Sequence, residues 1–230
     1  MVLNLDPDDH SRFSSFTILT TPYKTVSDQP ITTDVLIPKN LKTSTSPILL
    51  RYHGGGFVSG ASLFPGPNYR LAPEASMEDI LDDVEDHWKW IHSELPAFIQ
   101  AQTGGAVNVD TGRILTAGDS AGGSLCLMVA LSRPDQIKAV TASYPSPLNK
   151  RHLVPFDRLD DGARVPRGGV FVWHGNEDSV GPVRGSIKLD SELVFHLAVQ
   201  PGEHGFDADP KIDDDWMAHG LKNLVGAWLG

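Results

Sequence analysis

The stretch Gly118-Asp119-Ser120-Ala121-Gly122-Gly123 decides the fold of this chain. It follows a short apolar run at residues 114–117 and precedes a longer one at residues 124–131. This order predicts a strand, a sharp turn and a helix, with Ser120 exposed at the apex of the turn. The glycines permit a turn that is too tight for neighbouring Cβ atoms. The pattern G-x-S-x-G is typical of a serine nucleophile, but a phosphate-binding turn or a plain strand end also fits it.

A second glycine-rich segment, His53-Gly54-Gly55-Gly56-Phe57, follows the apolar run at residues 47–52. Three successive glycines let the backbone approach a substrate closely and turn N–H groups toward it. Acyl transfer needs such donors, because negative charge develops on the carbonyl oxygen in the transition state. Loops of the HGGG type form the oxyanion hole of lipases and esterases. The alternative is a flexible glycine loop with no functional role. The position of the segment upstream of Ser120, where the fold requires an oxyanion loop, argues against this alternative.

An acid and a base follow Ser120 in the chain order Ser, Asp, His. Asp178 lies in a loop after one predicted strand, and His204 lies in a loop after the next. His204 would take the proton of Ser120 and return it to the leaving group, while Asp178 would fix the imidazole tautomer. Glu177 is a rival for the acid, and the motif position favours Asp178. Taken singly, Asp178 could be a turn residue and His204 a surface histidine. The occurrence of all the motif residues in the expected chain order argues against a coincidence.

Composition and charge argue against several other classes of protein. The formal net charge of −10 argues against nucleic acid, whose phosphates require a basic surface, and against an anionic membrane surface. No apolar stretch approaches the roughly 18 residues of a membrane span, and the acidic N-terminus lacks the pattern of a signal sequence. We therefore expect a cytoplasmic protein. The oligomeric state stays open.

Metal and thiol chemistry are not expected. The sequence contains no HExxH, no cysteine-rich zinc pattern and no Walker loop, so we predict neither a metal nor a cofactor. The single cysteine, Cys126, excludes an internal disulfide. It lies in the apolar helix after Ser120, where a small core residue fits better than a nucleophile.

The remaining elements alternate between strands and helices. Residues 16–20 and 31–38 predict a hairpin, residues 139–144 a strand, and residues 216–229 a terminal amphipathic helix. The clearest helix spans residues 76–100. Ser76 and Asp79 form a capping box at its start, and Pro96 ends or kinks it. The whole chain, 1–230, is therefore predicted to be a single α/β domain with a mostly parallel central sheet flanked by helices.

The chain resembles the hormone-sensitive-lipase-like α/β-hydrolases, which are serine carboxylesterases and lipases, and several segments resemble uncharacterised fungal members. The segments that carry the resemblance are His53 to Phe57, Asn68-Tyr69-Arg70-Leu71-Ala72-Pro73-Glu74, Gly118 to Gly123, Asp178, and Pro201 to Phe206. The resemblance implies an α/β-hydrolase fold, a Ser-His-Asp triad and a small-molecule ester substrate. It also implies that the backbone N–H groups of Gly55, Gly56 and Ala121 form the oxyanion hole.

Two departures from the family pattern affect the expected site. In relatives, a helix and an inner strand separate the HGGG loop from the segment that resembles Asn68 to Glu74. Here only residues 58–67 intervene, too few for both, so one sheet strand is expected to be missing. Residues 147–168 are also too short for the helical cap of relatives. We therefore predict a reduced or absent cap and small or short-chain esters or lactones as substrates.

Two hypotheses of different classes remain. The first is a serine carboxylesterase that works through an acyl-enzyme, and the retained Ser120, Asp178 and His204 favour it. The second is a catalytically inactive α/β-hydrolase fold that binds a ligand or a partner, or a truncated gene product that lacks a sheet strand.

Overall fold

The computed structural model describes residues 13–41, 45–60, 66–146, 155–190, 195–207 and 214–230. The contacts group the chain into two compact units. One comprises residues 1–46 and 60–109, the other residues 47–59 and 110–230. Each unit is described by itself. The expectation of a single domain over residues 1–230 stays a prediction.

The first unit begins with the predicted hairpin, whose strands are longer than expected. Strands β1 (Phe16–Val26) and β2 (Gln29–Pro38) pair antiparallel, and Val26 faces Gln29 across the turn. Ser27 and Asp28 form a two-residue loop with φ values of 48° and 64°. Positive φ at both positions matches the right-handed twist of the flanking strands. This turn therefore fixes the register of the hairpin.

Two helices complete the first unit, and they confirm the predicted helix with its break. Helix α1 (Met77–Ser93) starts with the capping box of Ser76 and Asp79, and α2 (Leu95–Gln102) carries Pro96 in its first turn. Residues in the first turn of a helix have no intrahelical partner for their N–H groups, so a proline, which has no N–H, loses no hydrogen bond there. The buried apolar residues of α1 recur at helical spacing and form one face: Ile80, Val84, Trp88 and Ile91.

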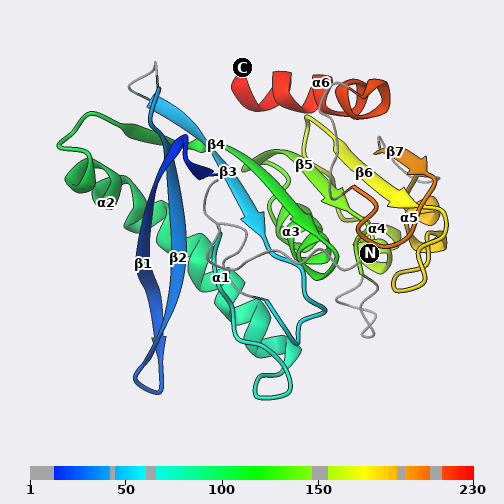
Figure 1. The fold of residues 1–230 in the computed structure, drawn as a ribbon, viewed down its shortest axis with the longest axis horizontal. Coiled ribbons are helices and arrows are strands. Elements are labelled where there is room, and N and C mark those ends of the chain that lie inside the picture. The colour runs from blue at the N-terminus through cyan, green and yellow to red at the C-terminus, as the bar shows by residue number, and fades with distance from the viewer. Residues whose placement is uncertain (1–12, 42–44, 61–65, 147–154, 191–194, 208–213) are drawn as a thin grey trace. The chain divides into compact units, whose positions relative to one another are not determined.

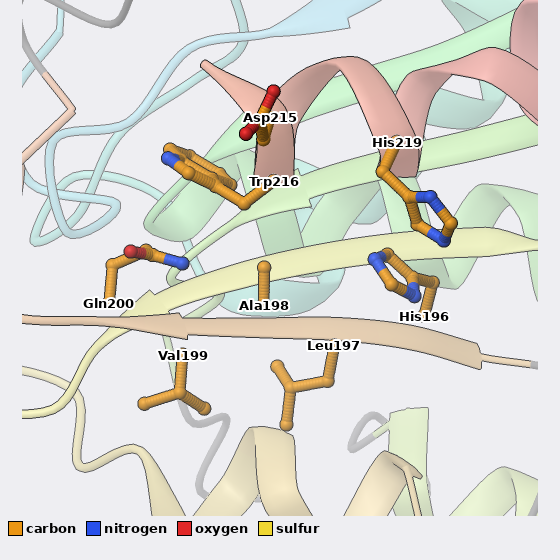
Figure 2. A pocket seen from close by; sticks show the side chains of 8 residues that line it. All are labelled: His196, Leu197, Ala198, Val199, Gln200, Asp215, Trp216 and His219. Carbon is orange, nitrogen blue, oxygen red and sulfur yellow. The ribbon is translucent and has the colours of Figure 1, made fainter.

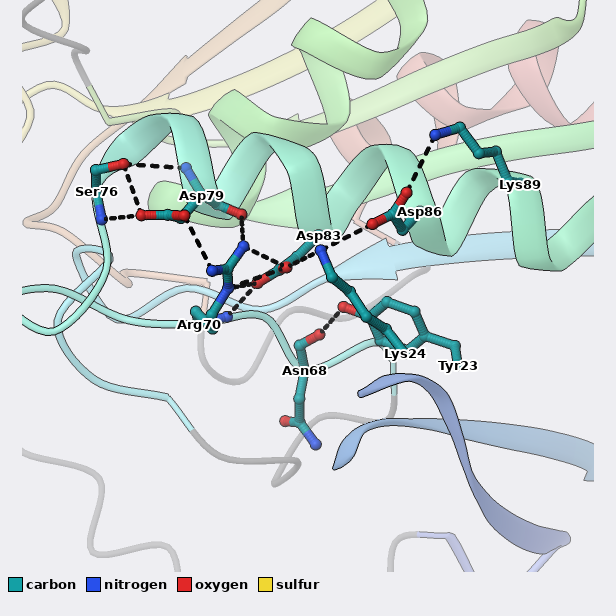
Figure 3. Close-up of polar contacts among 9 residues, drawn as sticks. All are labelled: Tyr23, Lys24, Asn68, Arg70, Ser76, Asp79, Asp83, Asp86 and Lys89. Carbon is teal, nitrogen blue, oxygen red and sulfur yellow. Dashed lines mark hydrogen bonds and ion pairs between the residues drawn. The ribbon is translucent and has the colours of Figure 1, made fainter. Parts of the chain in front are cut away.

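Arg70, from the family-like segment, is tied to α1 by a network of carboxylates (Figure 3). Its Nε lies 2.9 Å from Oδ2 of Asp83, and its Nη1 lies 2.9 Å from Oδ1 of Asp79. The side chain of Asp83 is completely buried and also accepts from Lys24 of β1 at 2.8 Å. Because a buried carboxylate is costly without partners, this network fixes the segment, the hairpin and α1 to one another.

The strand that the sequence predicts to be missing does not occur in the described residues between Tyr52 and Met77; residues 61–65 lie outside that description. What is present is an isolated antiparallel bridge between Thr33 and Pro67. Two backbone hydrogen bonds flank it, from Asp34 to Gly66 and from Asn68 to Thr32. Residues 66–68 therefore supply a few hydrogen bonds to β2 without forming a full strand.

The second unit is built on a five-stranded sheet in the order β3-β4-β5-β6-β7. The pairs β4–β5, β5–β6 and β6–β7 are parallel. The sequential order of parallel strands requires a crossover after each one, so their carboxyl ends meet at one edge. The strands span Thr45–Tyr52, Asn108–Asp119, Ile137–Ser143, Val170–Gly175 and Phe195–Gln200.

Helices cover both faces of this sheet (Figure 1). Helix α6 (Asp215–Leu229) packs on one face through Met217 and Leu224, which join a core of sheet residues: Leu115, Ala139, Phe171 and Ala198. Gly220 of α6 lies so close to Phe171 that a Cβ there would be 2.2 Å from the ring. The other face carries α3 (Ala121–Ser132), which is buried from Ala121 to Leu131. This α/β architecture agrees with the sequence prediction.

Two short helices lie in the connections of this unit. Helix α4 (Pro155–Asp160) is the one helix in residues 155–168, the described part of the segment where relatives carry a cap. The rest of that segment, residues 147–154, lies outside the description. Helix α5 (Arg184–Asp190) precedes β7. Over the residues described, no helix is long and apolar enough to cross a membrane.

Candidate active site

Ser120 occupies the tight turn between β4 and α3, as its glycine-rich surroundings predict. Its φ of 52° and ψ of −119° lie outside the usual regions for a residue with a side chain. The turn is held by a hydrogen bond from Ser120 N–H to the carbonyl of Ser143, at 3.0 Å. A Cβ on Gly122 would lie 2.2 Å from the carbonyl oxygen of Tyr52, so this position requires glycine. Close packing of β3 against the turn thus explains why glycine follows Ser120 at position 122.

The structure brings Ser120, His204 and Asp178 together. Nε2 of His204 lies 2.9 Å from Oγ of Ser120, and Nδ1 of His204 lies 2.7 Å from Oδ2 of Asp178. The side chain of His204 is 19 % exposed and that of Asp178 is fully buried. Each residue lies just beyond the carboxyl end of a parallel strand: β4, β6 or β7. The topology therefore gathers three residues that are 26 to 84 positions apart in sequence.

Asp178 is held in its ionised form by several donors. Burial by itself would raise the pKa of Asp178, but hydrogen bonds from the Gly181 N–H and from His204 lower it below the ordinary value. The two backbone donors, Val180 and Gly181, lie 2.9 and 2.7 Å from Oδ1. Glu177, the rival acid, is exposed, and its backbone N–H bonds to the carbonyl of Gly202. Asp178 rather than Glu177 therefore faces the imidazole.

His174 is a buried neighbour of Asp178 to which no sequence motif points. Its Nε2 lies 3.0 Å from Oδ2 of Asp178 and 2.6 Å from the carbonyl oxygen of Gly181. Its Nδ1 lies 2.8 Å from Oγ of Ser186. Burial lowers the pKa of His174, so the ring is neutral. The sequence signal is its position four residues before Asp178, at the end of β6.

The loop after β5 supplies two more neighbours of the triad that sequence reasoning missed. The ring of Tyr144 lies 4.5 Å, centroid to centroid, from that of His204 at an angle of 60°. The Oγ of Ser146 lies 2.9 Å from the Oγ of Ser120. Two prolines mark this loop in the sequence, but nothing in the local pattern points at Ser120.

The glycine-rich loop follows β3, and Gly55 and Gly56 adopt φ values of 107° and 65°. The carbonyl of Gly55 accepts hydrogen bonds from the N–H groups of Val58 and Ser59, which close the loop. In the described residues, the backbone hydrogen bonds of turns and loops use none of the N–H groups of Gly55, Gly56 and Ala121, the expected oxyanion donors. His53 is buried, which lowers its pKa, and its Nδ1 donates to the carbonyl of Gly54 at 2.7 Å. His53 thus anchors the loop through this hydrogen bond.

Thiol and metal chemistry would depend on Cys126 and on clusters of ionisable side chains. Cys126 is completely buried in α3, and burial raises the pKa of its thiol. In the same residues, no group of three or more His, Cys, Asp or Glu side chains is arranged to hold a metal ion.

A groove of about 520 Å³ lies elsewhere in the second unit, between β7 and α6 (Figure 2). His196 and His219 face each other across it with ring centroids 5.1 Å apart. Its lining contains none of the triad residues. We therefore do not assign this groove to the substrate.

Known carboxylesterases resemble this chain in sequence. The chain is 43 % identical over 188 residues to Probable carboxylesterase clz11 of Cochliobolus lunatus, covering 77 % of this chain and 84 % of that protein. This chain belongs to the hormone-sensitive-lipase-like α/β-hydrolase family. A family profile described as the alpha/beta hydrolase fold matches residues 63–162. The chain is therefore a carboxylesterase-type α/β-hydrolase, as its sequence motifs predict.

A second fungal relative bears on the length of this hydrolase. It is 28 % identical over 321 aligned positions to Probable carboxylesterase M8 of a Phoma strain, covering 97 % of this chain and 100 % of that protein. The hydrolase has only 230 residues, so the alignment requires gaps within it. These gaps agree with a shortened member of the family.

Solved structures share the fold of this hydrolase. One from a study of two fungal esterases of Rhizomucor miehei superposes with a TM-score of 0.72 at 18 % identity, covering 97 % of this chain and 86 % of that one. Esterase B of Lactobacillus rhamnosis gives a TM-score of 0.69 at 17 % identity, covering 94 % and 85 %. At these identities the likeness concerns the fold alone.

Proposed function

We propose that this hydrolase cleaves small carboxylic esters through an acyl-enzyme formed on Ser120. The observation that carries the proposal is the position of the His204 imidazole between two partners, 2.9 Å from Oγ of Ser120 and 2.7 Å from Oδ2 of Asp178. A base within hydrogen-bond reach of a hydroxyl, itself oriented by a third group, is the arrangement that activates a serine.

In the first half of the reaction, Oγ of Ser120 attacks the ester carbonyl carbon while its proton passes to Nε2 of His204. The charged Asp178 then stabilises the imidazolium and keeps the ring oriented. The carbonyl oxygen becomes an oxyanion, for which the N–H groups of Gly55, Gly56 and Ala121 are the proposed donors. Collapse of the tetrahedral intermediate breaks the bond to the alcohol, which leaves with the proton held by His204.

In the second half, a water molecule attacks the acyl group on Ser120 while His204 takes a proton from it. The same three N–H groups stabilise the second oxyanion. When the acid is released, the proton on His204 returns to Oγ of Ser120, and the enzyme is restored.

We propose that the acyl groups are short. Residues 155–168 hold a single six-residue helix, α4, where relatives are expected to carry a cap. A small cap offers little apolar surface to a long acyl chain, and burial of each additional methylene is worth roughly 0.8 kcal/mol. Lactones fit the same reasoning, because they too present a compact acyl group.

The test is hydrolysis of p-nitrophenyl acetate, butyrate and octanoate by the purified protein beside Ser120→Ala. Loss of hydrolysis in the variant, with an unchanged circular dichroism spectrum, is the expected result. An equal rate in the variant would remove Ser120 from the mechanism. The acetate and butyrate should be turned over faster than the octanoate; the reverse order would reject the proposal of short acyl groups.

The competing function, a non-catalytic member of the fold, predicts a different result. A wild type that unfolds cooperatively yet hydrolyses none of the three esters would favour it. A wild type without a cooperative transition would instead indicate that the shortened sheet limits folding.

A further inference from the structure

Ser146 is the one side chain besides His204 whose hydrogen bond to Oγ of Ser120 is resolved among the described residues. The two hydroxyl oxygens are 2.9 Å apart, a normal length for an O–H···O bond. Neither hydroxyl is fully exposed. Distance alone does not say which of the two serines is the donor.

The backbone after β5 brings Ser146 to this place. Tyr144 has a φ of 34°, an unusual value for a residue with a side chain, and its N–H donates to the carbonyl of Trp173 at 2.7 Å. The chain then runs over the first turn of α3, where a Cβ on Gly123 would lie 3.2 Å from Cα of Pro145. A bend at Tyr144 and a glycine at position 123 thus let the loop approach the nucleophile.

The loop does not need the side chain of Ser146 to hold this position. The N–H of Ser146 donates to the carbonyl of Ser120 at 3.0 Å. Its carbonyl accepts a hydrogen bond from Oγ of Ser124. Because both backbone groups of Ser146 already hold the loop against the Ser120 turn, its hydroxyl can bond to Oγ of Ser120 without a structural task of its own.

The direction of the hydrogen bond follows from counting protons. The ionised Asp178 can only accept, so Nδ1 of His204 carries a proton. In the neutral imidazole Nε2 is then an acceptor, and it takes the single proton of Ser120. Ser120 has no second proton, so Ser146 must be the donor.

We propose that Ser146 is a further catalytic residue, whose hydroxyl donates to Oγ of Ser120; this rests on the proposed esterase function. In the resting enzyme the bond turns the proton of Ser120 toward His204 and leaves one lone pair for attack. When the acyl-enzyme breaks down, the bond between Oγ and the acyl carbon is cleaved. Ser146 then stabilises the negative charge that develops on Oγ before His204 returns its proton.

The test compares Ser146→Ala and Ser146→Thr with the wild type in pre-steady-state hydrolysis of p-nitrophenyl acetate. Ser146→Ala should lower the acylation rate constant and kcat roughly tenfold with little change in KM, about the effect of one lost hydrogen bond. Ser146→Thr keeps a hydroxyl and should recover most of the rate. Ser132→Ala is the matched control, because its Oγ bonds to the carbonyl of Met128 within α3, away from the triad.

The outcomes separate the two proposals. Wild-type acylation by Ser146→Ala would overturn the role of Ser146. An equal loss in Ser146→Ala and Ser146→Thr would also overturn it, because the effect would then come from packing and not from the hydroxyl. Full activity of Ser120→Ala would instead overturn the esterase mechanism on which the inference rests.

Discussion

The Nε2 atom of His174 lies 3.0 Å from the same Oδ2 atom of Asp178 that bonds to His204. Nε2 of His174 also lies 2.6 Å from the carbonyl of Gly181, which can only accept, so this nitrogen carries the proton. The N–H of His174 is therefore bonded to the carbonyl of Gly181, and Oδ2 of Asp178 lies close to the same nitrogen. Burial alone would raise the pKa of Asp178, and hydrogen bonds from the Gly181 N–H and from His204 lower it, so the carboxylate beside His174 stays charged.

The charge of Asp178 is the basis of the first prediction. Asp178→Asn can present its amide N–H₂ to His204, which favours the wrong imidazole tautomer for accepting the proton of Ser120. We expect kcat for p-nitrophenyl acetate to fall about 10,000-fold, as in other triads, while the protein stays folded. Steady-state kinetics and circular dichroism measure both.

Glu177→Gln is the matched control, because Glu177 is adjacent but exposed. It should keep nearly the full rate. If kcat falls strongly in Glu177→Gln and only slightly in Asp178→Asn, the assignment of Asp178 as the acid is wrong.

Cys126 supports a second prediction. Its Sγ lies 3.1 Å from the carbonyl of Gly123 and 3.2 Å from that of Thr141, and the residue is completely buried. Because burial raises its pKa and blocks access, the thiol should not react with a disulfide reagent in the native protein. Spectrophotometric titration should find one reactive thiol only after denaturation. Rapid labelling of the native protein would contradict the buried position.

Local patterns were sufficient to predict much of this protein. The turn at Ser120, the capping box at Ser76 and the break near Pro96 each depend on neighbouring residues, so the sequence reveals them. The order of Ser120, Asp178 and His204 also placed each of these candidates in the loop after a predicted strand. The shortened link before Tyr69 indicated a missing strand, because ten residues cannot form both elements.

The contacts that were not predicted depend on the fold. Ser146 is 26 residues from Ser120, and it reaches the nucleophile only because β5 lies beside β4 and the chain bends at Tyr144. His174 faces Asp178 because β6 ends in a tight loop. A lone serine or histidine carries no local pattern that distinguishes such a contact from ordinary packing.

The carboxylate network of the first unit supports a third prediction, on stability. Asp83→Asn removes the charge that faces Arg70 and Lys24, and it leaves two cations beside a fully buried side chain. Both cations keep a second carboxylate, Asp79 for Arg70 and Asp86 for Lys24. We therefore expect the free energy of unfolding to fall by about 1.5–3 kcal/mol, the effect of losing charged hydrogen bonds at a buried side chain. Urea denaturation monitored by circular dichroism measures this change.

Asp86→Asn provides the comparison for this experiment. Asp86 also pairs with Lys24 at 2.8 Å, but its side chain is 37 % exposed. A pair of this kind contributes about 0–1 kcal/mol. If the free energy of unfolding falls equally in the two variants, the burial of Asp83 does not determine how much its ion pairs stabilise the protein.

The fourth prediction concerns acid stability and rests on His87 of α1. This histidine is buried, its Nε2 lies 3.1 Å from Oγ1 of Thr33, and its ring packs against those of Tyr23 and Trp90. Burial lowers its pKa from 6.5 to about 3. As the pH falls below 6.5, His87 binds a proton in the unfolded chain but stays neutral in the folded chain. The contribution of His87 to stability is therefore complete above pH 6.5 and is lost progressively toward pH 3.

His87→Leu removes this proton uptake while keeping an apolar side chain in the same place. Between about pH 7.5 and pH 4.5, the free energy of unfolding of the wild type should fall by about 2–3 kcal/mol more than that of the variant. Urea denaturation at the two pH values gives the difference, and other titrating groups cancel between the two proteins. His92→Leu, at an exposed position of the same helix, should keep the steep acid response of the wild type. If the wild type and His87→Leu lose stability equally, the buried imidazole is not the group that makes the fold sensitive to acid.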